Sequence, residues 1–163
     1  MFREMRRRKQ ALDSAACRTI LERGSCGVLA LSGDGGYPYA VPLSYAYAEG
    51  KIYFHSAVEG HKIDAIARDA RASFCVVDAD DVVPEEYSTN YRSAIAFGRA
   101  RVLTGEAARP GLLALSRKYC PGQDPKAEID GALSRVAVIE LEIEALSGKE
   151  SRALANARAA RAD

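Results

Sequence analysis

Residues 135–146 read RVAVIELEIEAL, and this stretch decides the class of fold. From Ile139 to Glu144, aliphatic side chains alternate with glutamates in a strict period of two. That period is the spacing of a β-strand, whose successive side chains point to opposite faces of a sheet. One face of this strand is therefore expected to be buried and the other wet, as is common in antiparallel sheets.

Five further segments are rich in aromatic, β-branched or alternating apolar residues and predict strands at 26–31, 37–47, 51–55, 72–77 and 93–103. Pro38 and Pro42 cannot donate to a sheet ladder, so the segment 37–47 is expected to be irregular or to lie at an edge. Helices are predicted at 14–22, 60–69, 106–119, 126–133 and 150–163, and a polar loop at 78–91. Six strands joined mostly by tight turns predict a mainly β fold with peripheral helices, a six-stranded antiparallel β-barrel.

Length and composition indicate one domain spanning residues 1–163, with a basic arm at about 1–11 and an Ala/Arg-rich helix at about 150–163. The formal net charge of +1 gives no overall electrostatic case for binding nucleic acid or a membrane. No apolar run approaches the length of a membrane span, and the start lacks the apolar stretch of a signal peptide. The 4 cysteines are scattered without a CxxC pair, which argues against a bound metal and favours a reduced, cytoplasmic protein.

The arm contains a basic run, RRRK at residues 6–9. Such a run is commonly a solvated and partly disordered terminus. The alternative is that one of these arginines folds back onto an anionic ligand, in the same chain or in a partner chain.

The segment YFHSAVEGHK, residues 53–62, ends a strand and opens a helix. The first turn of a helix carries unpaired backbone N–H groups and the positive end of the helix dipole. His61 and Lys62 lie in that turn, where positive side chains are unfavourable unless an anion lies among them. A phosphate there would accept hydrogen bonds from the backbone, the Ser56 hydroxyl and the Lys62 ammonium. The residues alone leave open a solvated helix start with a surface lysine.

Few other residues suggest catalysis. His55 and His61 do not have the spacing of a helical metal pair, and a histidine at a strand end is more often structural than catalytic. No GxSxG, P-loop or Rossmann glycine pattern is present, so an enzyme with this sequence would rely on a cofactor for its reactivity. The loop residues 85–93, EEYSTNYRS, either decorate the surface or contact a cofactor or a second subunit.

Several blocks of sequence, taken together and in order, resemble the pyridoxamine 5′-phosphate oxidase-related superfamily of FMN-binding split barrels. Within that superfamily, the chain is most similar to the branch that includes the nitroimidazole-resistance proteins. The likeness runs from about Arg6 to Lys149. The blocks are GYPYAVPLSY (36–45), GKIYFHSA (50–57), GHKID (60–64), STNYRS (88–93) and FGRA (97–100).

The resemblance implies a homodimer with two FMN sites at the subunit interface. It implies that the flavin ring rests against the second and third strands and that a helix start holds the phosphate. The implied ring contacts are Val41, Pro42, Leu43, Ser44, His55, Ser56 and Ala57. The implied phosphate contacts are Gly60, His61 and Lys62, and the loop around Tyr91, Arg92 and Ser93 would approach the cofactor or the dimer seam.

The first functional hypothesis is an FMN-dependent oxidoreductase acting on a small electron-poor substrate, such as a nitroaromatic compound. His55 would be its proton donor, since histidine exchanges protons near neutral pH. A second hypothesis is a non-catalytic flavin or haem carrier or sensor on the same barrel, and a third is an interaction protein that only dimerises. Oxidation of pyridoxamine phosphate is disfavoured, because the chain has 0 tryptophans and lacks the C-terminal Arg and His signature of those enzymes.

Overall fold

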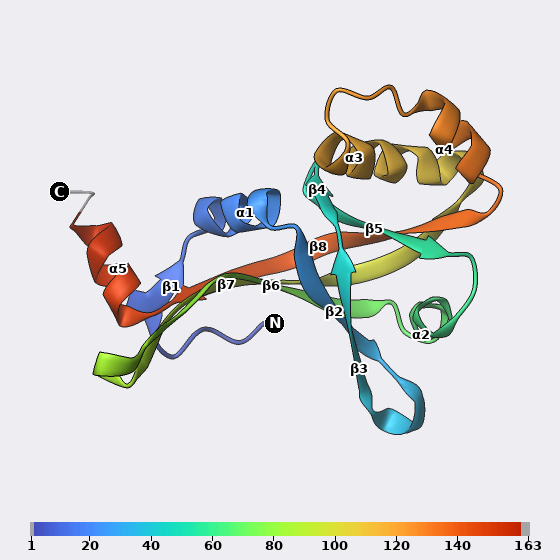
Figure 1. Cartoon of the computed structure of the whole chain (residues 1–163). Coiled ribbons are helices and arrows are strands. Elements are labelled where there is room, and N and C mark those ends of the chain that lie inside the picture. The colour runs from blue at the N-terminus through green and yellow to red at the C-terminus, as the bar shows by residue number, and fades with distance from the viewer. Residues whose placement is uncertain (1, 161–163) are drawn as a thin grey trace.

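The computed structural model describes residues 2–160, which form one antiparallel sheet with helices packed around it (Figure 1). The strands of this described part are β1 (Ala11–Leu12), β2 (Cys26–Ser32), β3 (Pro38–Ser44), β4 (Ala46–Ala48), β5 (Lys51–Ala57), β6 (Arg71–Val83), β7 (Ser88–Thr104) and β8 (Val136–Glu150). The α-helices are α1 (Ser14–Arg23), α2 (His61–Arg68), α3 (Arg109–Tyr119), α4 (Lys126–Ala132) and α5 (Arg152–Ala159). Short 3-10 turns are η1 (Arg8–Gln10), η2 (Asp34–Gly36), η3 (Pro84–Glu86) and η4 (Gly105–Ala108).

The sheet curls back on itself through its two outermost strands. The strand order is β3-β2-β6-β7-β8-β5-β4, and β1 pairs with β8. The edge strands β3 and β4 follow each other in the chain, separated by Tyr45 alone, which is fully buried. A single bent segment therefore supplies both edges of an unclosed sheet, and the irregular edge expected from the two prolines of residues 37–47 is observed.

The strand quoted first, β8, confirms the predicted alternation with one exception. Ile139 and Leu141 are fully buried, and Glu142 and Glu144 are exposed. Glu140 is buried as well, because it lies under Lys51 and Arg101, whose nitrogens are 3.3 Å and 2.6 Å from its carboxylate. Burial disfavours the charged form, but these hydrogen bonds prevail and hold the pKa of Glu140 below its usual value.

Two features of the prediction were wrong in detail. The strand count is eight in residues 2–160 and not six, because the segment 37–47 forms both β3 and β4 and because Ala11–Leu12 forms β1. The polar loop predicted at 78–91 is instead a hairpin, in which β6 continues to Val83 and β7 begins at Ser88. This hairpin projects beyond the barrel (Figure 1), so both of its faces meet water and its sequence shows no apolar alternation.

The helices cover the barrel at its ends and on one side. α1 and α2 contribute Ile20, Leu21 and Ile66 to the main core, together with barrel residues such as Phe54 and Phe74. α3 and α4 pack outside the barrel over a second cluster, which contains Tyr53, Leu112, Ile129 and Val138. No helix of residues 2–160 is long and apolar enough to cross a membrane. Residues 161–163, the end of the predicted C-terminal helix, lie outside the described residues.

One face of the sheet keeps apolar side chains at its surface, and we call it the open sheet face. Its central row runs straight across four strands, because Pro42 pairs with Val28, Val28 with Cys75, and Cys75 with Ile95. Val28 is 40% exposed and Val77 is 62% exposed. Within the described residues, the ring of Phe2 lies over this face at Phe97, with ring centroids 5.3 Å apart. The open sheet face consists of Val28, Ala30, Ala40, Pro42, Cys75, Val77, Ile95 and Phe97.

Candidate functional site

A pocket of about 400 Å³ opens where the end of β3, the end of β5 and helix α3 meet. β3 contributes Leu43 and Ser44, and β5 contributes His55. The other wall comes from α3 and the residue after it, namely Leu115, Ser116, Tyr119 and Cys120. The structure therefore brings together three residues that the family resemblance implied for a flavin site, from two different blocks.

The β3 residues of the predicted site divide between two faces. Pro42 and Ser44 are exposed, whereas Val41 and Leu43 alternate with them and pack against the main core. Pro42 and Ser44 thus offer a flat surface outside the barrel at the rim of the open sheet face. Val41 lies behind that surface and supports it, while Leu43 also reaches the pocket.

The β5 residues divide in the same way. His55 and Ala57 are exposed on the outer face of the strand. Ser56 is only 6% exposed and lies on the other face, in line with the fully buried Ile52 and Phe54. Its hydroxyl therefore does not share a surface with His55, and the predicted hydrogen bond from this hydroxyl to a phosphate stays a prediction.

The helix start that follows β5 places a cation beside free backbone donors. Gly60 precedes α2 with a φ of 119°, a left-handed conformation that favours glycine, and its carbonyl accepts from the N–H of Ile63 at 2.9 Å. The N–H groups of His61 and Lys62 come before the helical ladder and have no carbonyl of that helix to bond. The Lys62 side chain is half-buried and forms no ion pair with the described residues. This turn can accept an anion.

His61 is held by its own chain rather than free for a ligand. Its ring stacks on Tyr39 with centroids 4.0 Å apart, and its Nε2 lies 3.5 Å from a carboxylate oxygen of Asp34. The same carboxylate is 2.6 Å from Arg68. The two basic side chains at this turn therefore differ, because His61 has partners and Lys62 has none among residues 2–160.

The third predicted group, Tyr91 to Ser93, is not brought near His55. Arg92 pairs with Glu150 on β8, whereas His55 pairs with Val138 on the same strand. Twelve residues of β8 separate these two pairings, which is roughly 40 Å along an extended strand. Within one chain, Tyr91, Arg92 and Ser93 therefore do not line the pocket that contains His55.

Sequence reasoning missed the wall that α3 supplies. The Tyr119 hydroxyl accepts from the Tyr45 N–H at 3.0 Å and lies 2.6 Å from the Ser25 carbonyl, so it ties the end of α3 to the barrel. Lys118 lies 4.0 Å from the centre of the Tyr45 ring, and burial lowers the pKa of this lysine and raises that of Tyr45. The sequence offers no signal for these contacts, because they join positions more than 70 residues apart.

Proteins of the same fold are found among solved structures. A conserved hypothetical protein from Mycobacterium tuberculosis superposes with a TM-score of 0.78 and 21% identity, over 93% of this chain and 92% of the other. A proposed 5-nitroimidazole antibiotic resistance protein from Bacteroides thetaiotaomicron gives 0.74 and 23%, over 86% and 87%. An FAD and heme binding protein from Mycobacterium smegmatis gives 0.74 and 26%, over 88% and 74%.

The chain belongs to the pyridoxamine 5′-phosphate oxidase family, whose model matches residues 13–150. No curated protein sequence matches the chain. The predicted family and the mainly β split-barrel fold are thereby confirmed.

Proposed function

We propose that this protein binds FMN and acts as an oxidoreductase on a small electron-poor substrate, with nitroaromatic compounds as the first candidates. The observation that carries the proposal is the start of α2, where the unpaired Lys62 and two free N–H groups directly follow the strand that bears His55. Flavin binding is also supported by the M. smegmatis relative, which is an FAD and heme binding protein.

The residues present fit a flavin phosphate at the helix start. An anion there would accept hydrogen bonds from the N–H groups of His61 and Lys62 and would lie at the positive end of the α2 dipole. The Lys62 ammonium supplies a charge-assisted hydrogen bond, which is shorter and stronger than a neutral one. Gly60 allows close approach, because no atom lies within 4 Å of where a Cβ would stand.

The residues next to this turn fit a flat aromatic ring. Pro42 and Ser44 on β3 and Ala57 on β5 are small, exposed side chains on the two strands that meet at the pocket, so a ring system can lie against them without a clash. The flavin, when bound, would supply the electron and hydride chemistry. His55 would hold a proton at the edge of the pocket, and Leu115 and Ser116 of α3 would limit the size of the substrate.

The proposed site is completed by a second copy of the chain. Pro42 lies in the open sheet face, which leaves apolar side chains exposed and therefore suits a partner subunit. Tyr91, Arg92 and Ser93 do not line the pocket of their own chain, and we infer that they contact the flavin of the partner subunit. We therefore propose a homodimer with two FMN sites at its interface.

The proposal is tested by the visible absorbance of the purified protein and by mass spectrometry of the released cofactor. We expect a yellow protein that contains about one FMN per chain, loses its colour on reduction and is reoxidised by a nitroaromatic compound. Release of FAD instead of FMN would change the identity of the proposed cofactor but would still support a flavin site. A colourless protein that takes up neither flavin would overturn the proposal and favour an interaction protein.

A second candidate function is a non-catalytic flavin or haem binding protein. It is favoured by the exposed position of His55 at the pocket, since a neutral imidazole is a common haem ligand. Haem titration of the wild-type protein and of His55→Ala separates the two functions. A haem absorbance band that depends on His55, with no turnover of nitroaromatic compounds, would favour the carrier.

A further inference from the structure

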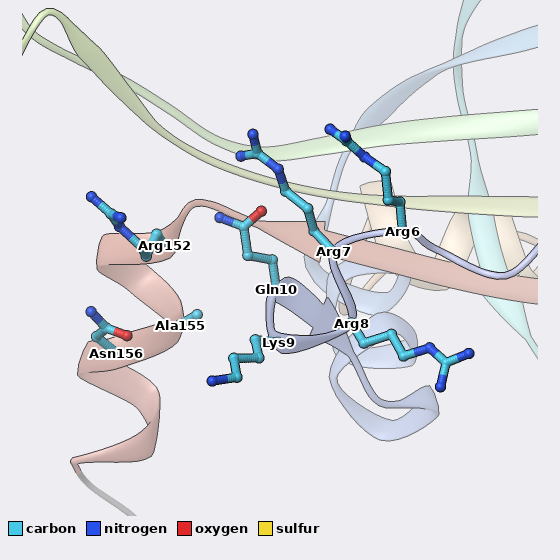
Figure 2. Close-up of a pocket in the computed structure, with 8 residues that line it drawn as sticks. All are labelled: Arg6, Arg7, Arg8, Lys9, Gln10, Arg152, Ala155 and Asn156. Carbon is cyan, nitrogen blue, oxygen red and sulfur yellow. The ribbon is translucent and has the colours of Figure 1, made fainter.

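A basic pocket lies between the N-terminal arm and helix α5 (Figure 2). Residues 6–10 form one wall, and Arg152, Ala155 and Asn156 form the other. Its volume is about 700 Å³, which falls in the range of small-molecule sites. The pocket has no acidic residue in its lining.

The lining contains more positive charge than the neighbouring residues neutralise. Of its five cationic side chains, Arg8 forms an ion pair with Glu4 and points away from the pocket in Figure 2. The other four, Arg6, Arg7, Lys9 and Arg152, form no ion pair within residues 2–160. Arg152 is also the first residue of α5, where the helix dipole makes a further positive charge unfavourable. An anion in the pocket would relieve this repulsion.

A buried amide in the same lining lacks a partner. Gln10 is 8% exposed, and its side-chain oxygen has no hydrogen-bond partner among the described residues. Figure 2 shows this amide directed into the gap between the arm and α5. Because rotation of an amide exchanges its oxygen and nitrogen, Gln10 can accept from a ligand hydroxyl or donate to a phosphate oxygen.

The arm is fixed in position, so the pocket is a built feature of the fold. The Gln10 N–H donates to the Arg7 carbonyl at 3.0 Å. Ala11 and Leu12 then pair with β8, and Arg158 of α5 donates to the Ala11 carbonyl at 3.4 Å. Both walls are thus joined to the same strand of the sheet.

We propose that this pocket binds a small anion with two or more phosphate groups, of the nucleoside polyphosphate class. Four unpaired cations exceed the charge of a single phosphate, and three of them are arginines, whose forked donors match phosphate oxygens. The amides of Gln10 and Asn156 suit the hydroxyl and amino groups of a nucleoside. The site does not depend on the proposed flavin function, because its residues are not those of the α2 start.

Isothermal titration calorimetry at constant ionic strength tests the proposal, with ADP, inorganic tripolyphosphate and orthophosphate as probes. We expect ADP and tripolyphosphate to bind at least about tenfold more tightly than orthophosphate. Tighter binding of ADP than of tripolyphosphate would identify a nucleotide, and the reverse would identify an inorganic polyphosphate. Absence of measurable binding heat with ADP and with tripolyphosphate would overturn the proposal.

Matched variants locate the binding. Lys9→Ala and Arg152→Ala should each weaken ADP binding about fivefold or more, whereas Arg8→Ala, with the same loss of charge, should change it less than about twofold. Circular dichroism checks that each variant is folded. Equal effects of Arg8→Ala and Lys9→Ala would contradict a defined pocket. Loss of ADP binding in Lys62→Ala would place the ligand at the flavin site and also contradict it. Tighter binding of a single-stranded oligonucleotide than of ADP would contradict a small-molecule ligand and would identify the pocket as part of a nucleic-acid binding site.

Discussion

Lys62 is the single residue on which the proposed phosphate contact depends most. It is half-buried and unpaired within the described chain, whereas its neighbour His61 is held by Tyr39 and Asp34. We expect Lys62→Ala to weaken FMN binding by about 1.5–3 kcal/mol, roughly 10- to 150-fold, because a charge-assisted hydrogen bond is lost. Quenching of flavin fluorescence measures the affinity. Lys126→Ala, an exposed lysine on α4, is the control, and an unaltered dissociation constant in Lys62→Ala would exclude the assigned contact.

Glu150 is a second residue whose environment leads to a prediction. It is fully buried and accepts hydrogen bonds from Arg92 at 3.0 Å and from Arg158 at 2.7 Å. Glu150→Gln should lower the free energy of unfolding by about 1.5–3 kcal/mol, because the two buried arginine contacts lose their negative partner and one of them also loses its acceptor oxygen. Urea unfolding measures this value. Glu144→Gln, an exposed glutamate of the same strand, should change stability by less than about 0.5 kcal/mol.

The candidate site shows what single residues reveal before a structure is known. The position of Lys62 in the first turn of a helix could be predicted, because the signals of a helix start are local and need only a few neighbouring residues. Pro42 is exposed and Val41 is not, and likewise His55 is exposed and Ser56 is not. These differences depend on which face of each strand meets the core. The wall formed by Ser116 could not be predicted, because α3 reaches the pocket through packing between distant segments.

At the scale of elements, β7 and β8 are joined at a bulge that requires a glycine. The register between these strands shifts between Phe97 and Gly98. A Cβ on Gly98 would stand 1.9 Å from the carbonyl oxygen of Glu142, which is backbone and cannot rotate away. Gly98→Ala should therefore destabilise the fold by about 1–3 kcal/mol, because the two strands must separate.

A matched glycine gives the control for this prediction. Gly131 lies in α4, and no atom lies within 4 Å of the point that its Cβ would occupy, so Gly131→Ala should be neutral or stabilise the protein by up to about 1 kcal/mol. Thermal or urea unfolding of both variants measures the difference. Equal stability of the two variants would mean that the strands separate freely at the bulge.

The elements differ in how well the sequence predicted them, for a physical reason. α1 was predicted closely, since Asp13 caps it and Gly24 ends it, and both signals are local. The hairpin of β6 and β7 was wrongly predicted to be a loop, because strands with two wet faces carry no period-two pattern. The split of residues 37–47 into β3 and β4 depends on their different partner strands, β2 and β5, and not on the segment itself.

At the scale of the whole molecule, the proposed dimer links the open sheet face to the flavin site. Val28 occupies the centre of the row that joins Pro42, Cys75 and Ile95. An aspartate at this position would put an unpaired charge into the middle of the proposed interface, where it would be desolvated. We expect Val28→Asp to yield a monomer in analytical ultracentrifugation, whereas wild type should sediment as a dimer.

The same variant should also lose its flavin, although Lys62 and His55 are unchanged. The reason is that Tyr91, Arg92 and Ser93 do not line the pocket of their own chain, so in the proposed dimer a monomer holds only part of the site. Ala15→Asp introduces the same charge on α1, a helix that packs on the core side of the sheet, and should leave mass and flavin content unchanged. A monomeric Val28→Asp variant that retains full FMN affinity would show that each chain carries a complete site. That result would contradict the proposed contacts from the partner subunit and would leave the proposed contact at Lys62 unaffected.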